Sequence, residues 1–229
     1  GYELGFNANS KGAAVGFDTE ITDGWVIGIG GLWNKTHMQW RKGRGNASIL
    51  GYYAGAYTDY FADNFYIGLS WLQGFDNCTS SRHINFSTIH EKAHATRRNR
   101  ETIGPLATAV FSGPDACFAF PYLILDYFFL KEGKVVENGA PGLNLEVREH
   151  SSSTLRTEAG FAVQVQDTNK SGTMCIAPLF GLGWAMELPL NRTPYNSKFE
   201  LEPSPFNVQG WDYTWQLVTL RFGFTMTYK

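Results

Sequence analysis

The sequence predicts an all-β protein, an antiparallel transmembrane up-and-down β-barrel. Apolar and polar residues alternate over many segments, as expected for strands with two different faces. These segments approach the ~9–11 residues that cross a bilayer at a tilt, whereas an average soluble strand has about 5–6. The composition agrees, since 17% of the residues are charged, 15% are aromatic and 25 are glycine. Aromatic girdles and tight turns are typical of outer-membrane barrels.

The segment Leu155–Gln166 shows the alternation most clearly. Its odd positions are apolar or small apart from Thr157, whereas its even positions include Arg156, Glu158 and Gln164. In a soluble sheet, the apolar face would pack on a core and the polar face would meet bulk water. In an outer-membrane barrel, the apolar face meets lipid and the polar face lines the lumen. The choice between these two environments therefore decides the predicted function.

The alternation recurs along the chain and predicts about nine long strands. We expect them at 12–21, 25–33, 47–60, 65–71, 101–111, 116–130, 155–166, 174–187 and 215–228. Turn residues at 22–24 and 62–64 predict short connections. We expect long polar loops at 35–46, 74–100, 131–153 and 188–212, with weak alternation at 83–90 that is compatible with strands prolonged above a membrane surface. Short turns and long loops together indicate an outer-membrane barrel.

The distribution of charge favours lipid on the apolar side. One face of several strands has no charged residue over about ten positions, whereas a soluble barrel would have a charged outer face. A water-filled lumen tolerates scattered ions, but a dry core would have to pair every one of them. We expect these side chains to face lipid: Trp25, Ile27, Ile29, Trp33, Phe65, Ile67, Leu69, Trp71, Phe161, Leu220, Phe222 and Phe224. We expect these polar side chains to face the lumen: Asp18, Glu20, Arg156, Glu158, Gln164, Glu187 and Arg221.

Several other classes of protein are disfavoured by the sequence. It has no run of ~18 apolar residues that would form a transmembrane helix. Its net charge of -2 offers no basic stripe, so we expect no nucleic-acid partner. The three cysteines match no zinc or redox motif, and no motif joins a nucleophile to a base. We therefore expect no metal, no cofactor and no enzymatic activity.

Two alternative functions remain open for the predicted β-protein. One is a stand-alone porin or adhesin barrel, and the other is a soluble glycan-binding β-sandwich.

Four segments in a fixed order resemble the β-barrel translocator domain of autotransporters, the type V secretion proteins. They are GAAVGFDTEITDGWVIGIGGLW (12–33), GYYAGAYTDYFADNFYIGLSW (51–71), SSSTLRTEAG (151–160) and IAPLFGLGWAMEL (176–188). The segment ENGAPGLNLEV (137–147) is similar to one that precedes the Arg-Thr-Glu strand in some members. Met186 departs from the family pattern, which usually has His at that place. Within the family, the segments resemble those of the chlamydial polymorphic membrane proteins.

The resemblance implies a location in the bacterial outer membrane and a function in protein transport. The barrel would anchor an N-terminal passenger domain and help to export it to the cell surface, and its partners would be membrane lipid, the passenger and the barrel-assembly machinery. The family barrel has twelve strands, and here 12–21 resembles the second strand and 215–228 the tenth. We therefore expect residues 1–229 to form a partial barrel of about 9–11 strands, truncated at both ends. The alternative is a shorter barrel in which Tyr228 is the aromatic end signal.

Some members of the family cleave the segment that precedes the barrel with acidic residues of the lumen. By position, Asp18, Glu20 and Glu158 are candidates for that role. The simpler interpretation is ordinary lumen polarity, with ion pairs such as Arg156–Glu158, because a catalytic carboxylate needs a matched partner within reach. We favour this second interpretation.

Overall fold

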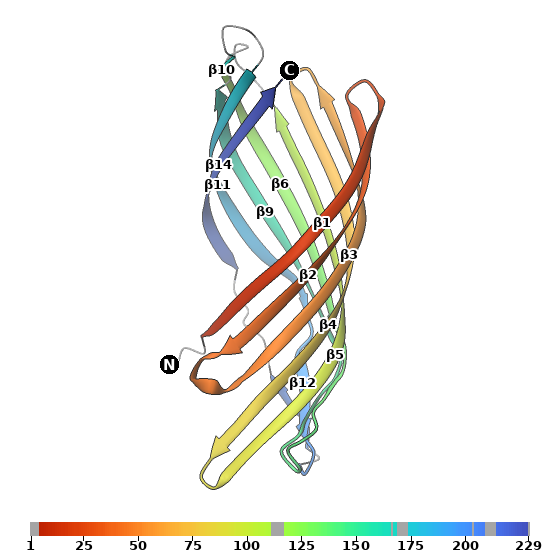
Figure 1. Cartoon of the computed structure of the whole chain (residues 1–229), viewed down its shortest axis with the longest axis vertical. Helices are drawn as coiled ribbons and strands as arrows, with labels where there is room; N and C mark the ends of the chain where they lie inside the picture. Colours follow the sequence, from red (N-terminus) through yellow and green to blue (C-terminus); the bar gives the residue numbers. More distant parts are fainter. Residues whose placement is uncertain are drawn as a thin grey trace.

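The computed structural model describes residues 5–110, 117–165, 167–168, 174–202, 204–208 and 214–228. It shows a ten-stranded antiparallel sheet that curls into a tall, incomplete barrel (Figure 1). Nine strands are long, and the tenth is the two-residue β10 (Asp167–Thr168) beside β11. The long strands are β1 (Phe6–Thr22), β2 (Trp25–Trp40), β3 (Gly45–Ala62), β4 (Phe65–Phe86), β5 (Ile89–Val110), β6 (Cys117–Glu132), β9 (His150–Val165), β11 (Met174–Arg192) and β14 (Trp215–Tyr228).

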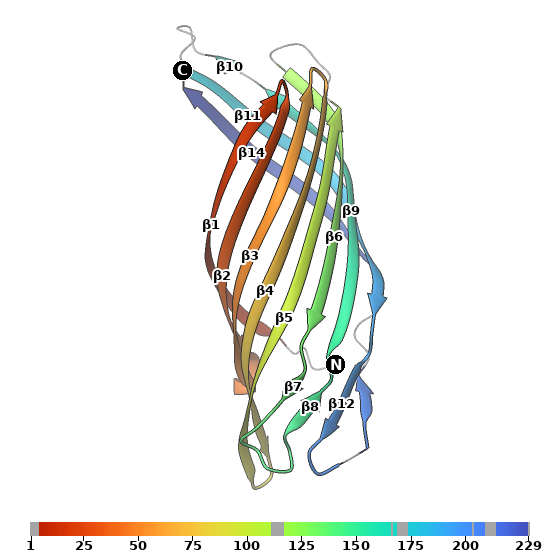
Figure 2. The same ribbon diagram turned by 90° about the vertical axis from the view of Figure 1, so that its right-hand side faces the viewer.

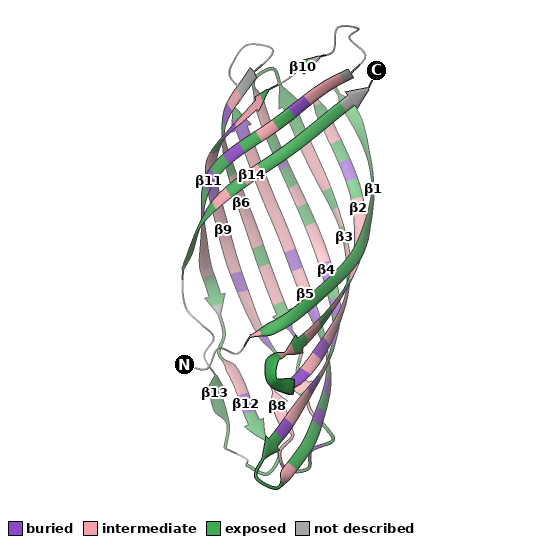
Figure 3. Ribbon diagram, turned by 60° about the vertical axis from the view of Figure 1, so that its left-hand side comes forward, coloured by how far each residue is buried: buried purple, intermediate pink, exposed green. Residues whose placement is uncertain are grey.

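Each long strand pairs with the next long strand in the sequence, from β1 through to β14. This is the up-and-down topology that the alternating sequence predicts, and the predicted fold class is confirmed. Within the described residues, β1 pairs only with β2, and β14 pairs only with β11. The sheet therefore has two open edges, which lie at the front of the view in Figure 3. No helix of the described chain is long and apolar enough to cross a membrane.

The two ends of the barrel differ in construction. At one end, β1–β2 and β3–β4 are joined by two-residue turns at Asp23–Gly24 and Asp63–Asn64, and Gly24 has a φ of 72°. The other end has the longer connections and a second sheet, seen below the barrel in Figure 2. That four-stranded sheet has the order β13-β12-β8-β7. Its strands are β7 (Val135–Val136), β8 (Leu145–Val147), β12 (Tyr195–Phe199) and β13 (Phe206–Val208).

The predicted long loops are largely wrong, because much of their length is strand. β2 continues to Trp40, followed by a short 3-10 turn at Arg41–Gly43 before β3. The β4–β5 ladder continues through the predicted loop 74–100 to its tip at Phe86 and Ile89. Beyond the apolar band one face of the ladder is still buried, but its buried positions carry polar or small residues such as Asp76, Ser81 and Ala93. The hydrophobic alternation therefore disappears while the backbone ladder persists. The weak alternation at 83–90 was the part of the pattern that indicated this extension.

The two faces of the curled sheet carry different side chains. The convex face has the large exposed apolar residues, such as Phe222 at 76% exposure. On the concave face, Ala109, Phe120 and Ala162 are buried together, with Tyr66, Tyr122 and Leu179 against them. A second small cluster of Ile84, Ala93 and Ala140 joins the β4–β5 hairpin to the loop that follows β7. The concave face is thus partly filled with side chains, and the polar site described next lies among them.

Candidate functional site: a buried ion network on the concave face

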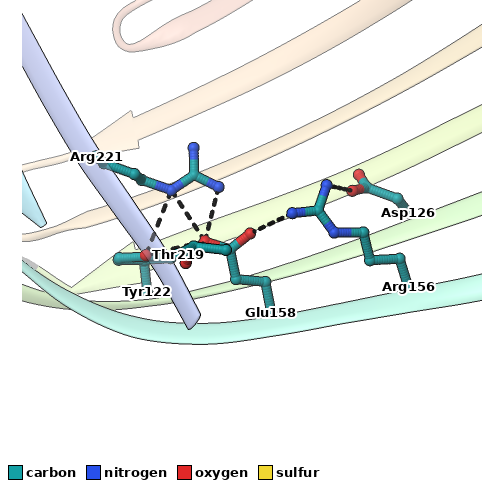
Figure 4. Close-up of polar contacts among 6 residues, drawn as sticks. All are labelled: Tyr122, Asp126, Arg156, Glu158, Thr219 and Arg221. Carbon is teal, nitrogen blue, oxygen red and sulfur yellow. Dashed lines mark hydrogen bonds and ion pairs between the residues drawn. The ribbon is translucent and has the colours of Figure 1, made fainter. Parts of the chain in front are cut away.

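Glu158 of β9 is the centre of a polar network on the concave face (Figure 4). It is only 1% exposed, the most completely buried large side chain of the described chain. Its Oε1 accepts hydrogen bonds from Tyr122 Oη at 3.0 Å, Thr219 Oγ1 at 2.8 Å and Arg221 Nη2 at 2.8 Å. Its Oε2 accepts one from Arg156 Nη2 at 2.9 Å. The carboxylate therefore connects β6, β9 and β14.

The charges of this network balance. Arg156 lies between Glu158 and Asp126, with Nη1 3.8 Å from Asp126 Oδ2. Arg221 also stacks on Tyr122, its Cζ lying 5.3 Å from the ring centroid. Two carboxylates thus face two guanidinium groups, which is the arrangement that makes buried charge tolerable. A carboxylate held by this many donors stabilises the wall, and the observed Arg156–Glu158 pair is the ion pair that the simpler interpretation names.

Two glycines make room for the tyrosine of the network. Tyr122 is the register partner of Gly160, and the Tyr122 ring lies across it. A Cβ at Gly160 would come closer than 3.0 Å to two ring atoms and the hydroxyl oxygen of Tyr122, and one at Gly183 would lie 2.5 Å from the same hydroxyl. Close approach of a neighbouring group is a known reason for glycine within a strand. The two glycines on β9 and β11 therefore leave the space in which the Tyr122 hydroxyl reaches Glu158.

The structure brings together three of the predicted lumen residues, Arg156, Glu158 and Arg221. Asp18 and Glu20 lie elsewhere, on the exposed edge strand β1. Asp18 accepts a short hydrogen bond from the Tyr57 hydroxyl, and Glu20 accepts one from the Gly24 amide at 2.9 Å. The remaining two, Gln164 and Glu187, are partly exposed, and Glu187 is the register partner of Arg156.

The sequence reasoning missed three members of the network, Tyr122, Asp126 and Thr219. Tyr122 belongs to an aromatic-rich strand, where alternation does not separate the faces, because both faces carry large side chains. A signal for Asp126 was present, since it is the one charged residue between Cys117 and Leu130 of that strand. Nothing in the local pattern identifies Thr219.

Apart from Phe65, which is half-buried, the predicted lipid-facing side chains are exposed, from 37% at Ile67 to 76% at Phe222. Aromatic residues mark both ends of this apolar band. At the short-turn end, Trp25 contacts Tyr60 with ring centroids 5.5 Å apart. The opposite end has Trp33 beside Tyr52 in register. The two belts are about 27 Å apart along the strand, or roughly 20 Å at a tilt near 40°, close to the ~25 Å of a barrel's apolar band.

The extended end above this band is held by ion pairs and hydrogen bonds. Glu132, at the end of β6, accepts a hydrogen bond from the Tyr195 hydroxyl at 2.8 Å and pairs with Arg97. Burial and this bond raise the pKa of Tyr195 to about 12. Glu200 accepts hydrogen bonds from the Gly142 amide and the Asn144 side chain, and these bonds lower the pKa of that carboxyl. The Tyr195–Glu132 bond therefore joins the second sheet to the barrel, and the Glu200 bonds join the end of β12 to the turn at Gly142–Asn144.

These features define a β-barrel of the bacterial outer membrane: long tilted strands, an aromatic-bordered apolar face and an ion network on the opposite face. The family model described as the autotransporter beta-domain matches residues 1–229, and the chain belongs to that family. It is an outer-membrane translocator domain, which carries a passenger domain in export to the cell surface. The more specific resemblance to chlamydial polymorphic membrane proteins remains a prediction.

Two solved structures show the same fold. The translocator domain of the autotransporter NalP from Neisseria meningitidis is 14% identical, with a TM-score of 0.67, and the match covers 98% of this chain and 81% of that one. The beta domain of the Bordetella autotransporter BrkA is 15% identical, with a TM-score of 0.61, covering 97% of this chain and 88% of that one. A search of curated proteins found no match.

Proposed function

We propose that the translocator places its convex face against lipid and its concave face toward an aqueous lumen that serves passenger export. The observation that carries this proposal is the contrast between the faces. Large apolar side chains such as Phe222 and Leu69 are exposed on one face, while Glu158 and Arg221 pair on the other. Hydrocarbon accepts the first set, and a polar lumen accepts the second.

The two ends support an orientation in the membrane. Outer-membrane barrels have short turns on the periplasmic side and longer loops outside. The turns at Asp23–Gly24 and Asp63–Asn64 therefore belong to the periplasmic end, and the tip of the β4–β5 hairpin belongs to the cell surface. Arg100, whose Cζ lies 5.6 Å from the Phe75 ring centroid, would lie at the outer interface. A cation there can reach the lipid headgroups while its stem covers apolar surface.

The barrel-assembly machinery is the proposed partner for insertion. The edges of β1 and β14 carry backbone N–H and C=O groups without strand partners among the described residues. Lipid cannot satisfy such groups, so a sheet with open edges needs protection while it enters the bilayer. Depletion of the machinery should leave the protein outside the outer-membrane fraction. Unchanged insertion after depletion would reject this partner.

The facing of the strands is tested by labels at adjacent positions. Leu69 and Ser70 of β4 are neighbours on opposite faces. Leu69→Cys and Ser70→Cys variants of the full-length protein, labelled with a fluorophore in outer-membrane vesicles, are compared for quenching by brominated acyl chains. We expect strong quenching at Leu69 and little at Ser70. Equal quenching at both positions, or recovery of the protein in the soluble fraction, would reject the proposed facing.

Export itself is tested on the same cells. The expected result is that external protease removes the passenger from intact cells producing the full-length protein. Glu158→Gln serves as the lumen variant and Glu20→Gln as a matched acidic control on the exposed edge strand. We expect the first to reduce surface passenger through a less stable barrel, and the second to leave it unchanged. A passenger that stays protected in the wild type would reject the export function while leaving the fold intact.

A further inference from the structure

A second polar cluster lies on the concave face, nearer to the extended end. Cross-strand register places a row of residues side by side from β2 to β6: Asn34, Gly51, Asp76, Asn99 and Glu132. Side chains in one such row share a face of the sheet. The row therefore concentrates carboxylate and amide groups on one part of the wall, separate from the Glu158 network.

Two carboxylates in this region compete for one donor. The Tyr53 hydroxyl lies 2.5 Å from Glu101 Oε2 and 3.4 Å from Asp76 Oδ1. One hydroxyl has one hydrogen, so it can donate to only one of them at a time. Asp76 is only 5% exposed, and the nearby guanidinium of Arg97 is paired with Glu132. Unlike Glu158, this pair of acids lacks a cation of its own within ion-pair distance in the described chain.

Two amide oxygens beside these acids have no hydrogen-bond partner among the described residues. They are Asn34 Oδ1 and Asn99 Oδ1, and both atoms are buried. Asn99 is 8% exposed and is the register partner of Asp76. A Cβ at Gly51 would come closer than 3.0 Å to both Asn34 Oδ1 and Asp76 Oδ1. The Asn34 and Asp76 oxygens thus converge on the space that the missing side chain of Gly51 leaves open, with Asn99 beside Asp76 in register.

We propose that Asn34, Asp76, Asn99 and Glu101 form a calcium site on the lumen wall. Ca²⁺ takes 6–8 oxygen ligands, including carboxylates, amide carbonyls and water, with flexible geometry. A cation here would be coordinated by the two amide oxygens that have no hydrogen-bond partner, and it would neutralise the two neighbouring carboxylates. One ligand would therefore account for both unusual features of the cluster. With only two charged ligands the site is expected to be weak, with a dissociation constant of about 10⁻⁴–10⁻³ M.

Calcium fits this set of ligands better than other metals do. The cluster contains no cysteine or histidine, and soft or nitrogen-preferring metals favour those ligands. Among the described residues, no group of three or more His, Cys, Asp or Glu side chains could hold a metal ion. Two acids completed by neutral amides and water therefore match a hard cation. Mg²⁺ demands nearly ideal octahedral geometry, which ligands on three separate strands are less suited to supply.

Binding is measured on the full-length protein, purified in detergent and stripped with a chelator. Isothermal titration with CaCl₂ should show one saturable site in the wild type. Asp76→Asn and Glu101→Gln should each weaken it at least tenfold, and Gly51→Ala should do so by filling the space between the oxygens. Asp59→Asn is the matched control, because Asp59 also accepts a tyrosine hydrogen bond, from Tyr66 at 2.9 Å. That control should bind calcium normally.

Folding of each variant is checked by heat-modifiable gel mobility, and thermal unfolding supplies a second readout. Calcium at millimolar concentration should raise the melting temperature of the wild type and of Asp59→Asn, but not of Asp76→Asn. The proposal is overturned if the folded wild type shows no saturable heat and no calcium-dependent shift, and in that case Asp76→Asn should raise the melting temperature without calcium. That result would identify a pair of acids that share a proton. Equal loss of binding in the Asp59→Asn control would overturn it as well.

Discussion

Replacing Glu158 by glutamine should destabilise the barrel by removing the charge that holds three strands together. The side chain accepts hydrogen bonds from Tyr122, Thr219, Arg156 and Arg221. Hydrogen bonds to charged groups contribute about 1.5–3 kcal/mol each, and breaking a buried pair costs about 3–5 kcal/mol. Glutamine keeps one acceptor, and the Arg221 side chain is 42% exposed, so water can replace part of the loss. We therefore expect a loss of about 2–4 kcal/mol.

The assay is urea unfolding of the protein in detergent or liposomes, followed by heat-modifiable mobility and tryptophan fluorescence. Glu20→Gln is the control, and it should change the free energy of unfolding by less than about 0.5 kcal/mol, as surface substitutions usually do. A double-mutant cycle with Arg221→Gln should give a coupling energy of at least about 1 kcal/mol. If Glu158→Gln matches the Glu20→Gln control and the cycle shows no coupling, the reasoning about this network is refuted.

Three further predictions concern the lipid face, the strand packing and the extended end. Leu69→Arg should cost about 2–4 kcal/mol in lipid, and Ser70→Arg much less, because only the first charge would meet hydrocarbon; urea unfolding in liposomes measures both. Gly160→Ala should cost about 1–3 kcal/mol by crowding a tyrosine ring, and equal stability to the wild type would contradict the packing. The Glu200 carboxylate, whose pKa is lowered chiefly by the Gly142 amide, stabilises its turn above pH 4.5 and loses that effect as the pH falls through the lowered pKa. Hydrogen-exchange protection at Gly142, corrected for the intrinsic rate, should therefore fall in acid while the barrel strands stay protected.

Strand alternation predicted the membrane-spanning part of the fold because lipid-facing positions require apolar side chains, whereas the lumen-facing positions between them accept polar ones. The segment Leu155–Gln166 shows this, with Phe161 exposed at 50% and Glu158 buried at 1% on opposite faces. The same principle failed at 74–100, because the buried face there carries polar residues such as Asp76 and Asn99, so burial no longer coincides with apolar residues in the sequence. Backbone pairing there depends on the ladder with the neighbouring strand, which leaves no periodic signal in one chain.

The candidate site was predictable only in part, since cross-strand contacts depend on register. Arg156 and Glu158 lie two residues apart, so any strand that includes them places them together. Arg221 is remote in the sequence, and it reaches Glu158 only because β14 pairs with β11 in one particular register. A shift of one residue would turn Arg221 to the lipid side. The pattern could therefore identify the polar face, but not which of its residues meet.

The two polar clusters on the lumen wall differ in their balance of charge, and we expect them to have different effects. Around Glu158 two acids face two guanidinium groups, so the network holds the strands without producing a large local field. Around Asp76 the acids outnumber the free cations, and two amide oxygens add their partial negative charge. Electrostatic potential from uncompensated acids is focused by low-dielectric walls. The part of the wall around Asp76 should therefore attract cations, while the Glu158 region stays neutral. Replacing Asp76 would change that attraction, whereas replacing Glu158 would chiefly change stability.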